Sequence, residues 1–242
     1  MREQLKPYHA ISAREVQKLM RAARRQSRQV DRLLEAMPAG WSVATYDPNL
    51  LFDAFPRLQL RDGFRLAAYQ YYDGGNGNGF AFAIPADKWL PEPAEGLDFG
   101  WSSSGAPILI SAGHALPEWV HYEVAQFLEG DGSPLSYFQA SIFMRELQEM
   151  GAFWHGCSWS THEVLTSAAQ IPKQKWQWQE KRPREWRPTV QQNPFGLWQV
   201  VFYSHTGLEQ ERIVLHRDTF EEGYQFSTEE KTIALGEGGY IF

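Results

Sequence analysis

The segment from 154 to 163 holds the densest group of side chains that could do chemistry. It reads Trp154-His155-Gly156-Cys157-Ser158-Trp159-Ser160-Thr161-His162-Glu163. Histidine, cysteine and glutamate are all competent zinc ligands. Seven residues along a helix rise about 10 Å, so His155 and His162 could share one ion only if the chain between them folds back as a loop. Because the chain has no C-x-x-C or H-E-x-x-H motif, we expect no metal and no cofactor.

The same segment places Cys157 near two imidazoles, which suggests a thiol nucleophile. Such a nucleophile requires a thiolate activated by a nearby imidazole, and closeness in sequence does not establish that contact. The competing interpretation is a small buried apolar residue, as free cysteines commonly are. A hydrolase-like enzyme with a site around His155, Cys157, His162 and Glu163 is therefore the alternative hypothesis of function.

Trp176 and Trp178 form a second candidate site. Residues two apart in a strand face the same side, and paired flat rings suit stacking on sugars, bases or protein side chains. The opposing interpretation is that these rings fill a core or lie under the stems of Arg and Lys. Six cations against two carboxylates over 173–187 predict a local positive patch. The predicted binding residues are Trp176, Trp178, Trp154, His155, Trp159 and His162.

The glycine run over 74–79 contains G-x-G-x-G but lacks the spacing of a dinucleotide-binding loop, which also requires a following helix. Here the run separates two apolar segments, 64–72 and 80–84, that are typical of strands. A strand, an Asn-Gly turn and a second strand predict a β-hairpin. A ligand-binding loop is the alternative interpretation.

Helix signals appear at several points of the chain. Ser12 and Glu15 form a capping box that predicts a long basic amphipathic helix over 13–37. Ser133 and Pro134 suit the start of a helix over 134–150, whose apolar stripe is wide enough for burial on most sides. We also expect a short helix over 161–169. For 117–128 we favour a helix, with a strand as the alternative.

Helices and strands mix without a regular β-α-β alternation, and neighbouring strands are joined by short turns. This pattern predicts an α+β fold with a mainly antiparallel sheet, a long N-terminal helix and a buried central helix. We expect one domain over 1–242, and a division near 173–196 is the alternative.

Composition limits the class of protein. The 242 residues are 43% hydrophobic, and the single cysteine, Cys157, favours a reducing compartment. From the charges near the N-terminus and the lack of a long apolar run, we expect no signal peptide and no membrane-spanning helix. Nine Lys and Arg against four Asp and Glu make residues 1–37 basic, whereas the remainder of the chain is acidic and disfavours nucleic acid.

These observations predict a cytoplasmic binding or interaction module rather than an enzyme. Its partner is expected to be a protein or a small polar ligand, with no membrane span and no nucleic acid. The basic helix over 1–37 is expected to pack against the acidic body or against a second copy of the chain, which would give a homo-oligomer. Docking of that helix on an anionic membrane or a nucleic acid is the alternative.

Overall fold

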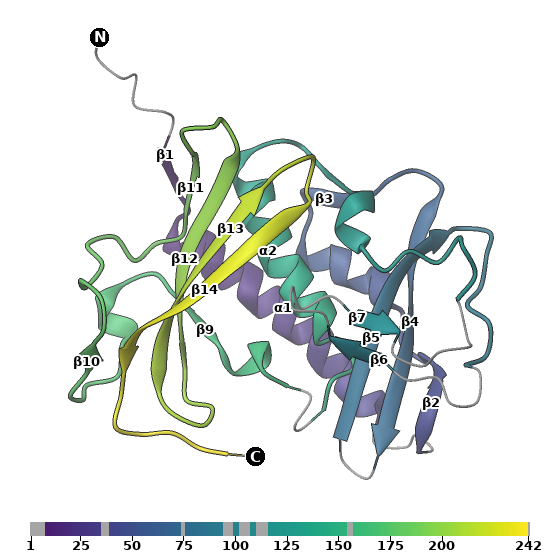
Figure 1. The fold of residues 1–242 in the computed structure, drawn as a ribbon, viewed down its shortest axis with the longest axis horizontal. Coiled ribbons are helices and arrows are strands. Elements are labelled where there is room, and N and C mark those ends of the chain that lie inside the picture. The colour runs from purple at the N-terminus through teal and green to yellow at the C-terminus, as the bar shows by residue number, and fades with distance from the viewer. Residues whose placement is uncertain are drawn as a thin grey trace.

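The computed structural model describes residues 8–34, 39–73, 76–93, 99–101, 107–109, 116–153 and 157–241. They form an α+β fold in which the strands of every sheet pair antiparallel, as the sequence predicts. Two larger sheets lie on either side of the molecule, and a long helix runs past both (Figure 1). None of the helices in these ranges has the length and apolar character needed to cross a membrane.

The larger sheet carries most of the C-terminal half of the chain. Its strands follow the order β1 (Tyr8–Ala10), β11 (Thr189–Gln192), β12 (Trp198–Thr206), β13 (Arg212–Phe220), β14 (Phe226–Leu235) and β10 (Gln177–Trp178), and β9 (Glu163–Leu165) also pairs with β12. Side chains alternate between the two faces. Val200, Phe202 and Ser204 therefore share one face of β12, and all three are buried.

The second sheet contains β2 (Gly40–Val43), β4 (Phe64–Asp73) and β5 (Asn76–Pro85). Strands β4 and β5 pair up to Asp73 and Asn76, which confirms the predicted hairpin. Residues 76–79 of the glycine run lie within β5, and residues 74 and 75 lie outside the described residues. Gly79 has a separate role, because a Cβ there would overlap the carbonyl oxygen of Met150. The missing side chain lets β5 approach the end of the central helix.

The described residues also form two short strand pairs. They are β3 (Leu58–Leu60) with β8 (Leu128–Gly130), and β6 (Phe99–Trp101) with β7 (Pro107–Leu109). The 3-10 helices in the described ranges are η1 (Pro48–Ala54), η2 (Val124–Phe127), η4 (Trp159–Thr161) and η5 (Ala168–Gln170).

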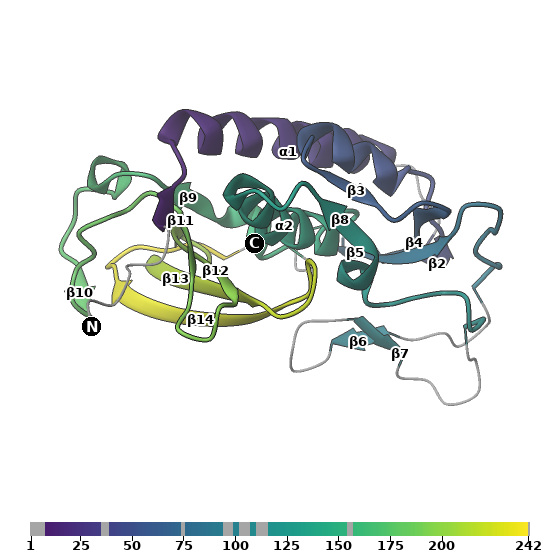
Figure 2. The same ribbon diagram turned by 90° about the horizontal axis from the view of Figure 1, so that it is seen from above.

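The helices α1 (Ala13–Leu34) and α2 (Pro134–Gln148) form layers over the larger sheet. Figure 2 shows α2 between α1 and strands β12 to β14. The Ser12 side chain and the Glu15 carboxylate cap α1 reciprocally, and the Ser133 hydroxyl accepts from the N–H of Ser136 at the start of α2. Helix α2 contacts α1, β5, β11 and β12. Its fully buried residues, such as Phe138 and Ile142, belong to the main hydrophobic core.

Two local predictions are wrong. The region 117–128 is not a helix, because His121 forms an isolated bridge with Ala83 and only η2 is helical, in 3-10 geometry. The expected helix over 161–169 is replaced by β9, which pairs with β12 through Glu163, Val164 and Leu165. In both cases pairing with a distant strand overrides a local helix signal.

Candidate functional site

The segment 158–162 is fixed at the C-terminal end of α2 by one carboxylate. Glu149 accepts from the backbone N–H groups of Ser158 at 2.6 Å and Ser160 at 2.7 Å, and also from that of Trp159. Burial raises the pKa of Glu149 above its usual range, and these three hydrogen bonds oppose the rise. These N–H groups lie at the start of η4 and have no partner within that helix, so the Glu149 carboxylate caps η4 and holds it at the end of α2.

Trp159 is the centre of a buried polar cluster between the helices and the larger sheet. Its indole Nε1 donates to Glu146 Oε1 at 2.8 Å, and its ring stacks on His162 with 5.4 Å between centroids. The guanidinium groups of Arg24 and Arg145 lie 5.7 and 5.6 Å from the ring centroid. Trp159 therefore contacts charged groups from both helices, although its own side chain is buried.

Glu146 is the buried carboxylate of this cluster. Burial raises its pKa above the usual range, whereas the charge of Arg24 and hydrogen bonds from Trp159 and Ser27 lower it. Arg24 Nε lies 3.4 Å from Glu146 Oε1, and the Ser27 hydroxyl donates to Oε2 at 3.2 Å. A buried charge needs such partners, so Glu146 ties α1 to α2.

A chain of hydrogen bonds continues from the Trp159 cluster across the larger sheet. His162 Nδ1 lies 2.7 Å from Ser204 Oγ, and the same Oγ lies 2.7 Å from His216 Nε2. His216 Nδ1 lies 2.9 Å from Glu230 Oε1. Ser204 and His216 are both 0% exposed. The chain therefore crosses β12, β13 and β14 on the face that α2 covers, and begins just before β9.

The proton positions in this chain follow from its carboxylate end and are assigned from the hydrogen-bond pattern. The pKa of Glu230 is lowered to about 2, chiefly by its hydrogen bond from His216, so Glu230 is ionised and accepts. Burial lowers the pKa of His216, which leaves a neutral ring with Nδ1–H as donor and Nε2 as acceptor. Ser204 then donates to His216 and accepts from His162, whose pKa burial lowers to about 3.

Ser204, His216 and Glu230 repeat the order of contacts in a serine, histidine and acid triad. A nucleophile must also be reached by its substrate, and Ser204 is fully buried. Next to these residues, the Arg145 guanidinium donates two hydrogen bonds to the Asp218 carboxylate, at 2.6 and 2.9 Å. With Ser204 buried, the hydrogen bonds from His162 to Glu230 join strands β12, β13 and β14, and each of these polar side chains has a partner.

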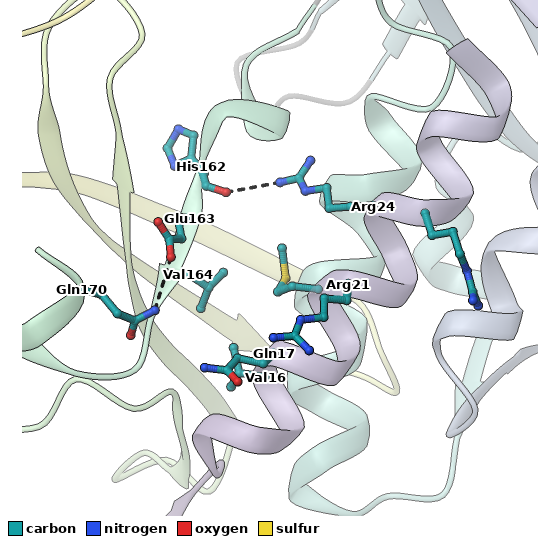
Figure 3. Close-up of a pocket in the computed structure, with 10 residues that line it drawn as sticks. Val16, Gln17, Arg21, Arg24, His162, Glu163, Val164 and Gln170 are labelled. Carbon is teal, nitrogen blue, oxygen red and sulfur yellow. Dashed lines mark hydrogen bonds between the residues drawn. The ribbon is translucent and has the colours of Figure 1, made fainter. Parts of the chain in front are cut away.

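A pocket of about 700 Å³ lies beside this network, between α1 and β9. Figure 3 shows it between the purple helix and the segment that carries His162 to Gln170. The lining residues are Val16, Gln17, Met20, Arg21, Arg24, Arg25, His162, Glu163, Val164 and Gln170. The pocket thus combines an apolar part with charged and amide groups.

Arg24 connects the two walls of the pocket. Its Nη2 donates to the carbonyl oxygens of Trp159 at 2.9 Å and His162 at 3.3 Å. The His162 ring points away from Arg24, while its carbonyl oxygen faces that residue (Figure 3). The pocket is therefore bounded by the backbone at His162, and the ring belongs to the buried hydrogen-bond chain.

The amide of Gln170 has a fixed orientation at the opposite wall. Its Oε1 accepts from the N–H and hydroxyl of Thr166, at 2.7 and 2.8 Å, and from the N–H of Ser167 at 3.0 Å. The Nε2 amino group consequently points toward Glu163, whose Oε1 lies 3.4 Å away (Figure 3). This wall offers one amide donor and one carboxylate to a ligand.

The structure brings together only part of the predicted binding set. Trp159 and His162 stack on each other, whereas Trp154 and His155 lie outside the described residues. Cys157 is half-buried, and its relation to His155 stays a prediction. Within the described ranges, no three His, Cys, Asp or Glu side chains gather in a way that could hold a metal ion.

Trp176 and Trp178 lie apart from Trp159, on the other face of the larger sheet. Both are half-buried and pack on a cluster that contains Trp186, Ile213 and Ile233. Trp176 Nε1 donates to the carbonyl of Pro172 at 3.1 Å, and Trp178 meets Trp186 edge-on at 6.3 Å between ring centroids. The guanidinium of Arg182 lies 5.5 Å from the Trp178 ring centroid. These contacts give the two rings a packing role over the sheet.

Sequence reasoning missed Ser204, His216 and Glu230, and it did not place Gln170 at a site. One signal could have found the first of them. Alternation along β12 puts Ser204 on the same face as Val200 and Phe202, and a polar residue at a core-facing position requires a partner. The identity of that partner depends on the register of β12 and β13, which the sequence does not reveal.

Comparison with known proteins does not add an identity. No family model, no curated protein and no solved structure matches the chain. Function must therefore be argued from the geometry of the site itself.

Proposed function

We propose that this protein is a binding module that holds a small polar molecule in the pocket between α1 and β9. The volume of about 700 Å³ carries the proposal, because pockets for small molecules commonly measure about 300–1,000 Å³. Val16, Met20 and Val164 offer apolar contact, while Gln17 and Gln170 offer hydrogen bonds. Such a mixture of apolar and polar lining is typical of sites that bind small molecules.

Preorganisation supports the same proposal. Arg24 and Glu149 fix the chain at Trp159 from two sides, through hydrogen bonds to its carbonyl oxygen and its N–H. Three hydrogen bonds also fix the Gln170 amide. The wall that carries Gln170 is therefore ordered before a ligand enters, and rigid sites lose less free energy on binding.

The proposal is tested by a ligand-observed NMR screen of small polar fragments against two matched variants. Gln17 is exposed on α1 and lines the pocket, so Gln17→Trp should fill it and abolish binding. Lys18 is the next exposed residue and does not line the pocket, so Lys18→Trp should keep the same fragments. Fragments that bind the wild type and Gln17→Trp equally would show that this pocket is not the site.

A second copy of the chain could cover the same face of α1, where Gln17, Arg21 and Arg25 are exposed. A homo-oligomer formed in this way would exclude a ligand from the pocket. Sedimentation velocity over rising protein concentration separates the two cases. The binding proposal expects a monomer whose fragment binding is independent of concentration, whereas a dimer disrupted by Gln17→Trp would support the oligomer.

A hydrolase-like enzyme is the second candidate, and the geometry at Ser204 is the observation that favours it. The Ser204 Oγ to His216 Nε2 distance of 2.7 Å would let His216 accept the hydroxyl proton. The buried serine would first have to become accessible. Labelling by a fluorophosphonate that is lost in Ser204→Ala would support the enzyme, and the binding proposal expects no labelling.

A further inference from the structure

The α1 wall of the pocket carries arginines that form no ion pair within the described part of the fold. Gln17, Arg21, Arg24 and Arg25 recur at helical spacing, so one stripe of α1 supplies all four. Arg24 lies against Glu146 and two carbonyl oxygens. Within the described part of the chain, Arg21 and Arg25 have no carboxylate within 4.0 Å.

We infer that the ligand of this pocket is a small organic anion whose carboxylate or phosphate group meets Arg21, and this inference rests on the proposed function. The planar guanidinium binds both groups through paired hydrogen bonds. Arg21 and Gln17 point toward Gln170 across the pocket (Figure 3). An anionic group at the α1 wall would meet the Arg21 guanidinium, and Gln17 on the same stripe of α1 offers an amide donor beside it.

The charge distribution of the pocket sets the position of that anion. Glu163 is the one carboxylate among the lining residues and lies on the β9 wall, opposite Arg21. It would repel an anionic group placed beside it, so the group belongs at the α1 wall. The protein as a whole has a formal net charge of −6. A cleft with an excess of positive charge concentrates anions locally, even in a protein whose net charge is negative.

The apolar residues of the pocket offer a surface for the carbon skeleton of the ligand. Val16, Met20 and Val164 line the pocket beside the charged stripe, and Val16 and Val164 are buried members of the main core. A carbon skeleton lying on them would leave its acidic group at the exposed Arg21. Free phosphate lacks that skeleton, so it should bind less tightly than an organic anion bearing the same group.

The test is an NMR screen of fragments in matched triplets that share one skeleton and carry a carboxylate, a carboxamide or an amidine. A parallel pair, phenyl phosphate and inorganic phosphate, separates an organic phosphate from the free ion. Carboxylates should predominate among the ligands. Arg21→Gln should weaken their binding about tenfold to a hundredfold, the loss expected for a hydrogen-bonded charge pair. Arg184→Gln removes the same charge from an exposed position outside the pocket and should change affinity less than about twofold, because salt screens distant charges.

Two results separate the possible failures. If carboxamides or amidines bind as well as carboxylates, and Gln17→Trp still abolishes their binding, the anion inference is wrong and the binding pocket stands. If no fragment loses affinity in Gln17→Trp, the proposed function itself is wrong. Equal weakening by Arg21→Gln and Arg184→Gln would show an effect of net charge only and would also overturn the inference.

Discussion

Arg24 Nη2 lies 2.9 Å from the carbonyl oxygen of Trp159, and this bond joins α1 to the segment that leads into β9. The same guanidinium lies 3.4 Å from Glu146, whose side chain is 1% exposed. One residue of the N-terminal helix therefore stabilises a buried carboxylate and holds the second wall of the pocket in place.

Removing Arg24 should destabilise the fold. Arg24→Met leaves Glu146 buried without its cation, and we expect the free energy of unfolding to fall by about 3 kcal/mol. Arg21→Met removes an exposed cation from the same helix and should change that energy by no more than about 0.5 kcal/mol. Urea denaturation of both variants gives the comparison. Equal midpoints would show that the Arg24 contacts contribute nothing to stability.

Acid should destabilise the protein through its buried histidines. The pKa of His162 is lowered from 6.5 to about 3 by burial, and that of His216 is lowered as well. Below pH 6.5 the unfolded chain binds protons that these folded rings do not, so stability is lost as the pH falls from 6.5 toward 3. Glu230 acts in the same direction below its ordinary value of 4.5. Glu146 and Glu149, whose pKa values are raised, act in the opposite direction.

His162→Gln isolates the contribution of one ring, because glutamine can still donate to Ser204 without titrating. Unfolding of the variant should take up about one proton less than unfolding of the wild type. The slope of its unfolding free energy against pH should therefore be smaller by about 1.4 kcal/mol per pH unit, where the unfolded histidine is charged. Urea denaturation at a series of pH values from about 6 to 5 measures that slope. A slope identical to that of the wild type would mean that His162 is not held neutral in the fold.

Trp178 provides a test of the aromatic region. It packs on Trp186 over the larger sheet, so Trp178→Ala should lower the free energy of unfolding by about 2 kcal/mol, less than a fully buried tryptophan would. Thermal unfolding measures the effect on stability. A pull-down of binding partners with the wild type and with Trp178→Ala, which keeps the basic residues over 173–187, is the control. An unchanged melting temperature together with loss of a bound partner would favour the predicted binding face at Trp176 and Trp178.

The sequence predicts those helices and strands whose capping or turn residues lie next to one another in the chain. The Ser12–Glu15 and Ser133–Ser136 caps and the hairpin ending at Asp73 and Asn76 are all present. The prediction of a helix over 161–169 is wrong because this segment forms β9 by pairing with Ser204 and the residues beside it in β12, about forty residues later in the chain.

The candidate site shows the same limit. Trp159 and His162 could be chosen from residue type and spacing, and they do meet. Their functional neighbours come from four other elements: Arg24 from α1, Glu146 from α2, Ser204 from β12 and His216 from β13. Only the packing of α1 and α2 against a sheet of fixed register brings these groups together, and a single sequence carries no direct sign of that packing.

The location of a bound ligand tests the central claim most directly. Crystals soaked with the tightest-binding fragment should show it between α1 and β9, in contact with Val164 and Met20 and with its polar group near Arg21. The same fragment should be missing from crystals of Gln17→Trp. A fragment found elsewhere on the molecule, or bound equally in both crystals, would contradict a binding site in this pocket.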